Sequence, residues 1–392
     1  MERRRFIRLV GGGSVAAATL GSLGLSGCSA ALPAEAIEAW RGPGPVQPGD
    51  DVRRWLLSYA ILAAHSHNLQ SWVADLGAAD VITLSCDPTR LLPQTDPLSR
   101  QIMMSHGTFL ELLDIAARER GLRADITLFP QGVFEGRLPD QRPIARIRLQ
   151  PDTAVRKDPL FAHILHRHTN RNRYDPGRSV PEEVWAAIHA SVDASTVRVG
   201  HVGLDRPDLM QAHRVIANEA WRVELCTARI VKETFSVLRV GAAEVAAHRD
   251  GLTLMAPWPV ALARLGLFDR SKVPAAEDYA TTSQIRDFAG TLDATPGFLW
   301  MVTPANDRAS QVNAGRAYAR VQLAATAQGI AMQPLSQALQ EYPEQKQTYA
   351  DIHALVGATQ PGQTVQMWAR AGYAAPVEPS PRRRLSDFIR AS

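Results

Sequence analysis

Cysteine is scarce in this chain, and the motifs that use cysteine to bind metals are missing with it. Three cysteines occur in 392 residues, without the spacing of a zinc finger. Heptad repeats and the aromatic motifs of RNA-binding modules are also absent. What remains is an ordinary globular composition, 45% hydrophobic and 21% charged, with enough length for one large domain or two of moderate size.

A strong excess of charge is missing as well. The formal net charge is +4, but residues 1–28 carry four arginines against one glutamate, so the remaining chain carries about +1. Sequence-independent binding of nucleic acid needs a broad basic face, which a nearly neutral protein lacks. We therefore expect no nucleic-acid partner.

The later sequence also lacks an uninterrupted apolar run that is long enough to span a bilayer. The stretch "GLTLMAPWPVALARLGLF", residues 251–268, is broken by two prolines and by Arg264. An apolar stretch of this kind suits a lid over a pocket or a packing arm.

The first 28 residues are typical of an export signal. "RRRFIR" resembles a twin-arginine (Tat) signal, and an apolar run follows from Leu9 to Gly27. "LSGC" resembles a bacterial lipobox, in which Cys28 is lipidated and becomes the new N-terminus; an uncleaved anchor is the alternative. We expect a Tat-exported protein on the periplasmic or cell-envelope side, held to the membrane by lipid alone. Residues 29–50, rich in Pro, Ala and Gly, are expected to be a tether.

Two segments about 200 residues apart share one pattern. Residues 99–120 and 313–328 each have apolar side chains at helical spacing, a glycine near the start and a glycine at the end. Strand-like runs flank both of them. The pattern indicates a degenerate duplication, with a first half at 51–160, a second half at 161–392 and a lid-like insert at about 205–290. Cys86 and Cys226 are expected to be free, buried thiols.

The stretch "HRHTNRNRY", residues 166–174, concentrates charge that folding alone does not require. Arg167, Thr169 and Arg171 alternate, so in an extended segment they can face one side. Two guanidinium groups and a hydroxyl suit a phosphate, and His168 adds a ring donor. The alternative is a solvated basic loop before a helix.

A second polar stretch, "HSHNLQSW" at residues 65–72, follows a predicted helix. The side-chain amide of Asn68 complements a ring edge that has an acceptor beside a donor, such as the pyrimidine edge of a flavin. Zinc is the alternative for the clustered histidines, either His163, His166 and His168 or His65 and His67. We find no HExxH helix or matching carboxylate beside them, so we expect no metal.

Together these stretches resemble the FMN-dependent nitroreductase superfamily, and in particular its fused-half, Acg-like branch. "RHTNRNRYDPGRSVPEEV" is similar to the family's phosphate motif, and "HSHNLQSW" to its second motif, although His65 and Ser71 stand where prolines are usual. "PRRRLSDFI" matches the closing basic motif, and "GIAMQPLSQ" corresponds to the segment that contacts the flavin ring through its backbone. The resemblance implies the cofactor FMN, bound by Arg167, His168, Thr169, Arg171, Ser66, Asn68, Gln70, Pro334, Leu335, Ser336, Arg382 and Arg383.

The resemblance also implies an α/β (α+β) fold of two homologous halves, each with a central sheet flanked by helices, forming a pseudo-dimer in one monomeric chain. Only the second half has the Arg-x-Thr-x-Arg pattern, so one FMN per chain is expected. The implied activity is two-electron reduction of a nitroaromatic, quinone or similar acceptor, with no protein catalytic residue required. NAD(P)H is scarce outside the cytoplasm, so the electron donor is open. The alternative is a protein that sequesters flavin with little turnover.

Overall fold

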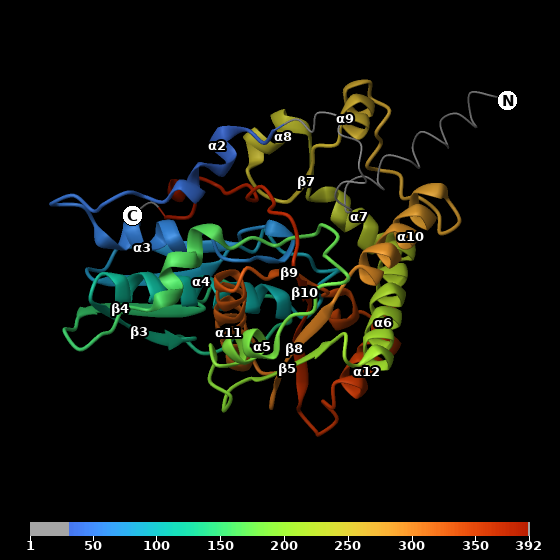
Figure 1. Ribbon diagram of the computed structural model, residues 1–392. Coiled ribbons are helices and arrows are strands. Elements are labelled where there is room, and N and C mark those ends of the chain that lie inside the picture. Colours follow the sequence, from blue (N-terminus) through green and yellow to red (C-terminus); the bar gives the residue numbers. More distant parts are fainter. Residues whose placement is uncertain (1–30, 391–392) are drawn as a thin grey trace.

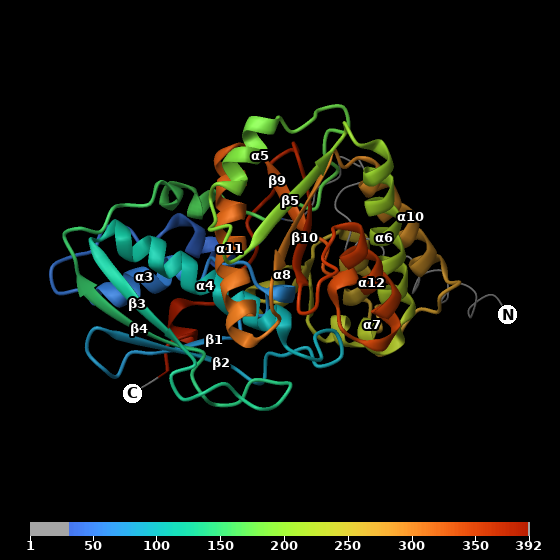
Figure 2. The same ribbon diagram turned by 90° about the horizontal axis from the view of Figure 1, so that it is seen from below.

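The computed structural model describes residues 31–390 (Figures 1 and 2). The predicted export signal and lipidated Cys28 lie outside the described residues. The described chain is a mixed α/β protein built on two antiparallel sheets of four strands each. The predicted fold class is confirmed at this level.

The first sheet has the strand order β1-β2-β4-β3. Its strands are β1 (Trp72–Asp75), β2 (Val81–Cys86), β3 (Leu122–Leu128) and β4 (Ala145–Pro151). In β4 buried and exposed side chains alternate, because one face of the sheet packs on the core and the other faces solvent.

The second sheet has the strand order β5-β8-β10-β9. Its strands are β5 (Arg198–Gly203), β8 (Gly297–Thr303), β9 (Ala331–Pro334) and β10 (Thr364–Gly372). Almost every residue of β10 is buried, since both faces of this sheet are covered. Arg370 is the one charged residue in that strand.

Both sheets have the same topology. In each, a strand leads into a long helix, the next strand returns at the sheet edge, and the last strand pairs between these two. The long helices are α4 (Arg100–Glu119) and α11 (Arg308–Ala327). They pack against each other between the two sheets (Figure 2).

Two glycines allow α4 and α11 to cross in close contact. A Cβ on Gly107 would lie 1.9 Å from the carbonyl oxygen of Val312, and a Cβ on Gly315 would lie 1.9 Å from that of Met104. One and the same shift along the sequence carries Met104 onto Val312 and Gly107 onto Gly315. The contact is therefore reciprocal, as in an isologous interface between two copies of one fold.

Further helices cover the two halves. In the first half, α3 (Val52–Ala60) packs on α4. In the second half the covering helices are α5 (Glu182–His189), α6 (Pro207–Cys226), α7 (Ala228–Ser236), α10 (Tyr279–Asp293) and α12 (Lys346–Leu355). Short 3-10 turns complete the chain: η2 (Ser66–Asn68), η3 (Pro159–His166), η4 (Gln337–Leu339), η5 (Pro343–Gln345) and η6 (Leu385–Asp387).

The expected insert at 205–290 differs in part from a lid. Its first and last helices, α6 and α10, pack together and bury Met210, Ala217 and Phe288 against the second sheet, so they belong to the core of the second half. The part between them contains β6 (Leu238–Val240), α8 (Gly241–His248), β7 (Leu252–Leu254) and α9 (Pro257–Arg264). This part has a small apolar core of its own.

Part of the expected tether is folded. The helices α2 (Ala34–Ile37) and η1 (Glu38–Arg41) lie on the body of the protein, and Trp40 is 8% exposed. The indole of Trp40 donates a hydrogen bond of 2.8 Å to the carbonyl of Ser380. Apolar burial thus fixes a segment whose composition had indicated a flexible linker.

Both cysteines in the described residues are free thiols. Cys86 is buried as expected, but Cys226 is exposed, because it ends α6 at the surface. Within residues 31–390, no helix combines the length and the apolar character needed to cross a membrane.

Candidate functional site

The segment around Arg167 lies where the two halves meet. Arg167 is 3% exposed, and its guanidinium donates to the side-chain oxygen of Gln322 on α11 at 2.8 Å and to the carbonyl of Leu62, just after α3, at 2.9 Å. One bond therefore goes to each half. Loss of hydration lowers the pKa of Arg167 to about 10, which still leaves it cationic at neutral pH.

Thr169 and Asn170 extend the second sheet. Thr169 forms a parallel bridge with Met332 of β9, and the N–H of Asn170 donates to the Met332 carbonyl at 3.0 Å. Strand β9 leads directly into Pro334, Leu335 and Ser336, so the structure brings these predicted residues close to the basic segment. The N–H of Leu335 is already bonded to Trp368 of β10 at 2.7 Å, which leaves the half-buried Pro334 and Ser336 as the accessible part of this turn.

Arg171 connects the two stretches that the sequence singled out. Its side chain is exposed, and desolvation by the surrounding protein lowers its pKa. Desolvation and, to a lesser extent, the charge of Arg171 together lower the pKa of His67 to about 4. His67 of the first half and Arg171 of the second half are thus electrostatic neighbours, and His67 is neutral at pH 7.

The η2 turn carries His67 in a strained backbone. His67, Asn68 and Gln70 have φ values of 49°, 53° and 54°, in the left-handed region that non-glycine residues seldom adopt. The hydroxyl of Ser66 bonds to Gln101 at 3.0 Å and to the His67 ring at 3.1 Å, so it orients that ring. Backbone strain of this kind is retained where the surrounding structure requires one particular side-chain direction.

Arg370 is a second arginine beside Arg171 and was not among the predicted site residues. Its side chain is fully buried in β10 and donates to Gln333 at 2.6 Å and to the carbonyl of Asn172 at 2.8 Å. The guanidinium stacks 3.9 Å above the ring of Tyr174. Desolvation lowers the pKa of Arg370, and so does the charge of Arg171.

Several buried polar atoms around these arginines have no hydrogen-bond partner among the described residues. They are the Nε of Arg167, the Nδ1 of His168, the hydroxyl of Tyr318, the Nε2 of Gln322 and the Nη1 of Arg370. Most buried polar groups in folded proteins are bonded, so an accumulation of unpaired ones at one place indicates a missing partner. Four of these five atoms carry a hydrogen that they can donate at neutral pH, and the fifth, on the His168 ring, can donate in one tautomer.

The charge of this cluster is equally unmatched. Within residues 31–390, neither Arg167, Arg171 nor Arg370 forms an ion pair with a carboxylate, and Arg171 makes no hydrogen bond at all. Buried charges are normally paired. Arg167 and Arg370 are buried and Arg171 is exposed, and three cations without an acidic partner are chemically suited to an anion; we refer to Arg167, Arg171 and Arg370 below as the unpaired cluster.

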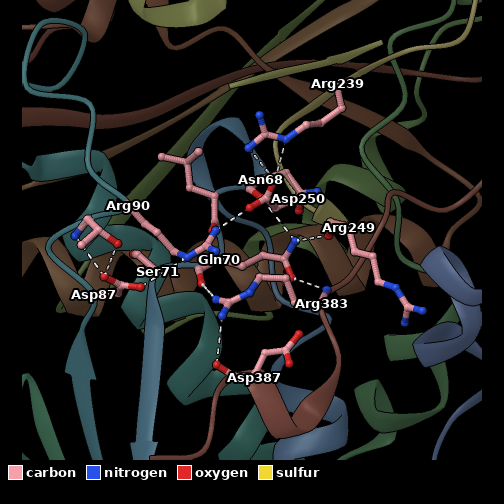
Figure 3. A network of polar contacts seen from close by, with 12 residues as sticks. Asn68, Gln70, Ser71, Asp87, Arg90, Arg239, Arg249, Asp250, Arg383 and Asp387 are labelled. Carbon is pink, nitrogen blue, oxygen red and sulfur yellow. Dashed lines mark hydrogen bonds and ion pairs between the residues drawn. The ribbon is translucent and has the colours of Figure 1, made fainter. Parts of the chain in front are cut away.

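The remaining predicted residues form a different network (Figure 3). Asn68 donates to the carbonyl of Pro381 at 3.0 Å, and buried Gln70 donates to the carbonyl of Arg249 in the insert at 2.9 Å and accepts from the N–H of Arg383 at 3.0 Å. This network joins the first half, the insert and the C-terminal segment. The side-chain amides of Asn68 and Gln70 therefore bond to protein in this structure and do not face the unpaired cluster.

Carboxylates neutralise three arginines around this second network. Asp250, which is 3% exposed, accepts from Arg90 and, at 2.8 Å, from Arg239 (Figure 3), and Arg249 pairs with Glu38 at 2.9 Å. We refer to these five residues as the paired clamp. The paired clamp connects the insert to the loop that follows β2 and to η1.

Arg382 has a structural role in this conformation. Its guanidinium donates to the carbonyls of Ile61, Leu62 and Ala63, which follow α3, and at 2.9 Å to the side-chain oxygen of Asn68. A cation at the carbonyl end of a helix is stabilising. Arg382 has no donor left for a phosphate, and Arg383 donates to the carbonyls of Gln70 and Asp387.

Sequence reasoning did not assign Tyr318, Gln322 or Arg370 to the candidate site, and it considered His67 only as a possible zinc ligand. A signal for Arg370 exists, since a single arginine interrupts the otherwise apolar strand "TVQMWARAG". His67 gives no such signal, because its importance comes from the turn that places it against Arg171. Within the described range, no three His, Cys, Asp or Glu side chains are grouped in a way that could hold a metal ion.

Comparison with known proteins places the chain near the nitroreductases. No family model matches it. Two curated proteins from Mycobacterium tuberculosis, strains CDC 1551 and H37Rv, each named "Putative NAD(P)H nitroreductase", are 26% identical to it over 362 residues, which is 89% of this chain and 95% of theirs. The chain is therefore a distant relative of these two proteins over most of its length, which agrees with the resemblance seen in the motifs.

Solved structures of nitroreductases are also similar to it. The FMN-dependent nitroreductase NfnB from Mycobacterium smegmatis, in complex with NADPH, is 19% identical with a TM-score of 0.33, covering 58% of this chain and 95% of that one. A nitroreductase with bound FMN from Bacteroides fragilis is 14% identical with a TM-score of 0.29, covering 56% and 90%.

Proposed function

We propose that this protein is an FMN-dependent oxidoreductase that transfers two electrons to a nitroaromatic, quinone or similar acceptor. The unpaired cluster is the observation that carries the proposal. A phosphate ester dianion supplies the negative charge and the acceptor oxygens that this cluster lacks. Among phosphate esters, FMN is the one that the resemblance of the motifs implies, and the name of the distant relatives, "Putative NAD(P)H nitroreductase", fits a redox role.

The phosphate would be held chiefly by the second half. Arg171 has a free guanidinium within the described chain, Arg370 has a free Nη1, and Thr169 lies in the segment that bridges to Met332 of β9. Arg167, which bonds both halves, would contribute its Nε and the field of its buried charge. These residues fit the cofactor, because their unpaired atoms are donors and phosphate oxygens are acceptors.

The first half would border the same ligand through His67 and Ser66. Bound FMN would supply the redox chemistry, since it accepts two electrons from a donor and passes them to an acceptor. The task of the chain is to bind and orient. The low pKa of His67 keeps its ring neutral, so it can donate one hydrogen bond and accept another without adding charge.

The two halves with equal topology support a monomeric pseudo-dimer with one cofactor between them. Export by the Tat pathway and lipidation at Cys28 remain part of the proposal, and place the enzyme at the cell envelope. The electron donor there would be NAD(P)H or another reductant.

The first test is whether the purified protein is yellow and whether heat releases FMN from it. We expect one FMN per chain and bleaching of the flavin under anaerobic NADPH or a quinol. Colourless protein that does not take up added FMN would contradict the binding proposal. Yellow protein that neither donor reduces would contradict the enzyme and leave a flavin-sequestering protein.

A further inference from the structure

The tip of the insert exposes large apolar side chains. Trp258 is 58% exposed, Leu265 is 70% exposed and Leu267 is 45% exposed, all within or just after α9. We refer to these three residues as the apolar tip. A contiguous stretch with so many uncovered apolar groups costs solvation free energy, so such a surface usually has a partner.

The apolar tip lies on the same side of the molecule as the start of the described chain. Helix α2 packs on α8, and both α8 and α9 pack on β6. Figure 1 shows α2, α8 and α9 along one edge. The ion pair between Glu38 and Arg249 fixes the first folded residues to the insert.

The predicted lipid anchor cannot be far from this edge. Cys28 precedes Ala31, the first described residue, by three positions, and three residues span at most about 11 Å. Since residues 34–41 are folded onto the body, they add no slack to the tether. A lipid on Cys28 would therefore hold the edge that carries α2, α8 and α9 next to the bilayer.

One basic side chain beside the apolar tip is available to an anionic membrane surface. In the segment that includes α9 and the following turn, residues 257–272, Arg270 pairs with Glu244 and Lys272 pairs with Asp269, whereas Arg264 forms no ion pair within the described chain. Aromatic and leucine side chains among basic residues are typical of surfaces that rest in the headgroup region of anionic membranes.

We propose that the apolar tip inserts into the outer part of the lipid bilayer to which Cys28 is anchored, so that the protein stands on the membrane in one fixed orientation. The occupant of this surface is lipid, and a second copy of the chain is the competing outcome. The inference rests on the predicted lipidation and not on the proposed flavin site. Its failure therefore leaves the flavin proposal intact.

Tryptophan fluorescence tests this directly. Trp258 is one of eight tryptophans and, among residues 31–390, the one that is exposed. The full-length lipidated protein would be reconstituted into vesicles of phosphatidylethanolamine and phosphatidylglycerol, with or without brominated acyl chains, which quench nearby indoles. For the wild type, we expect brominated lipid to quench the emission of Trp258, which is up to about an eighth of the total. For Trp258→Phe, we expect brominated and ordinary lipid to give the same emission.

A second pair of variants separates docking from a general effect on the fold. Leu265→Ser/Leu267→Ser keeps Trp258 and should reduce its quenching at least severalfold, because the tip no longer penetrates. The matched control is Val133→Ser/Leu138→Ser, which alters exposed apolar residues in the loop between β3 and β4 and should leave quenching unchanged. Equal quenching in wild type and Trp258→Phe would overturn the proposal. So would unquenched Trp258 in a dimer that Leu265→Ser/Leu267→Ser dissociates, since the tip would then be covered by a second copy.

Discussion

Two groups of arginines at the junction of the halves are opposites in their surroundings. The paired clamp sets Arg90, Arg239 and Arg249 against Asp250 and Glu38. The unpaired cluster of Arg167, Arg171 and Arg370 has no carboxylate in the described chain. The difference teaches that burial of arginine alone indicates nothing about function; what matters is whether the protein itself supplies the counter-charge.

The physical consequence is that removing a charge has opposite effects in the two groups. Breaking a buried ion pair leaves an uncompensated charge and destabilises the fold. Removing a cation from a cluster that is already uncompensated relieves repulsion and desolvation, at the cost of the ligand. The predictions below use this contrast, from the largest expected effect to the smallest.

The largest effect is expected from Arg171→Ala/Arg370→Ala. Each variant removes charge-assisted hydrogen bonds worth about 1.5–3 kcal/mol, so the affinity for FMN should fall by roughly 1,000-fold in the double variant, measured by calorimetric titration of apoprotein. The free energy of unfolding of the apoprotein should not fall in Arg171→Ala alone, because Arg171 makes no hydrogen bond within the described chain, whereas Arg370→Ala also removes the bonds to Gln333 and Asn172 and should lower it. The control is Arg239→Ala in the paired clamp, which should keep FMN affinity within a few-fold of wild type.

Asp250→Asn should lower the stability of the fold and leave FMN binding largely unchanged. Asp250 is buried and accepts from two arginines that are themselves partly exposed, so loss of its charge should lower the free energy of unfolding by about 2–3 kcal/mol. Denaturant unfolding of the apoprotein measures this. An unchanged midpoint in Asp250→Asn would remove the contrast between the two groups.

Acid should weaken the apoprotein through His67. Its folded pKa of about 4 lies below the ordinary value of 6.5, so the unfolded chain binds more protons. The stabilisation is present above pH 6.5 and is lost as the pH falls toward 4. His67→Gln should therefore reduce the acid-induced loss in unfolding free energy by an amount on the order of 1–3 kcal/mol, whereas His248→Gln, at an exposed position on α8, should not. Identical pH profiles for all three proteins would show that His67 is not desolvated.

The smallest effect is expected at an exposed ion pair. Arg229 and Glu344 are 2.5 Å apart, but their side chains are 41% and 42% exposed. Such pairs contribute about 0–1 kcal/mol, so Arg229→Gln should change the thermal midpoint little and FMN affinity not at all. A larger change in the thermal midpoint or in FMN affinity would mean that this exposed ion pair also contributes to the stability of the folded protein.

The sequence predicted what local pattern encodes. The helical spacing of apolar residues and the paired glycines identified α4 and α11, and the unusual charge of residues 166–174 identified Arg167 and Arg171. Composition gave the wrong expectation for the tether, because tertiary contacts decide whether such a segment is folded. Trp40 lies in a segment with linker composition, yet it is buried beside Arg382 with its ring 4.9 Å from the guanidinium.

The role of Arg382 illustrates the same limit within the site. A run of three arginines looks the same in the sequence whether its guanidinium groups bind a phosphate or the carbonyls at the end of a helix. Only the fold shows that Arg382 donates to the carbonyls of Ile61, Leu62 and Ala63. Arg370 was missed because it lies about 200 positions from Arg171 in a strand that otherwise indicates core. Pairing between distant strands is not encoded in any single stretch.

The most direct test compares FMN with riboflavin, which has the same ring but no phosphate, by calorimetric titration of the apoprotein. If the unpaired cluster holds the phosphate, FMN should bind at least about 100-fold more tightly than riboflavin. That preference should disappear in Arg171→Ala/Arg370→Ala and persist in Arg239→Ala. Equal affinity of the wild type for FMN and riboflavin would contradict the account.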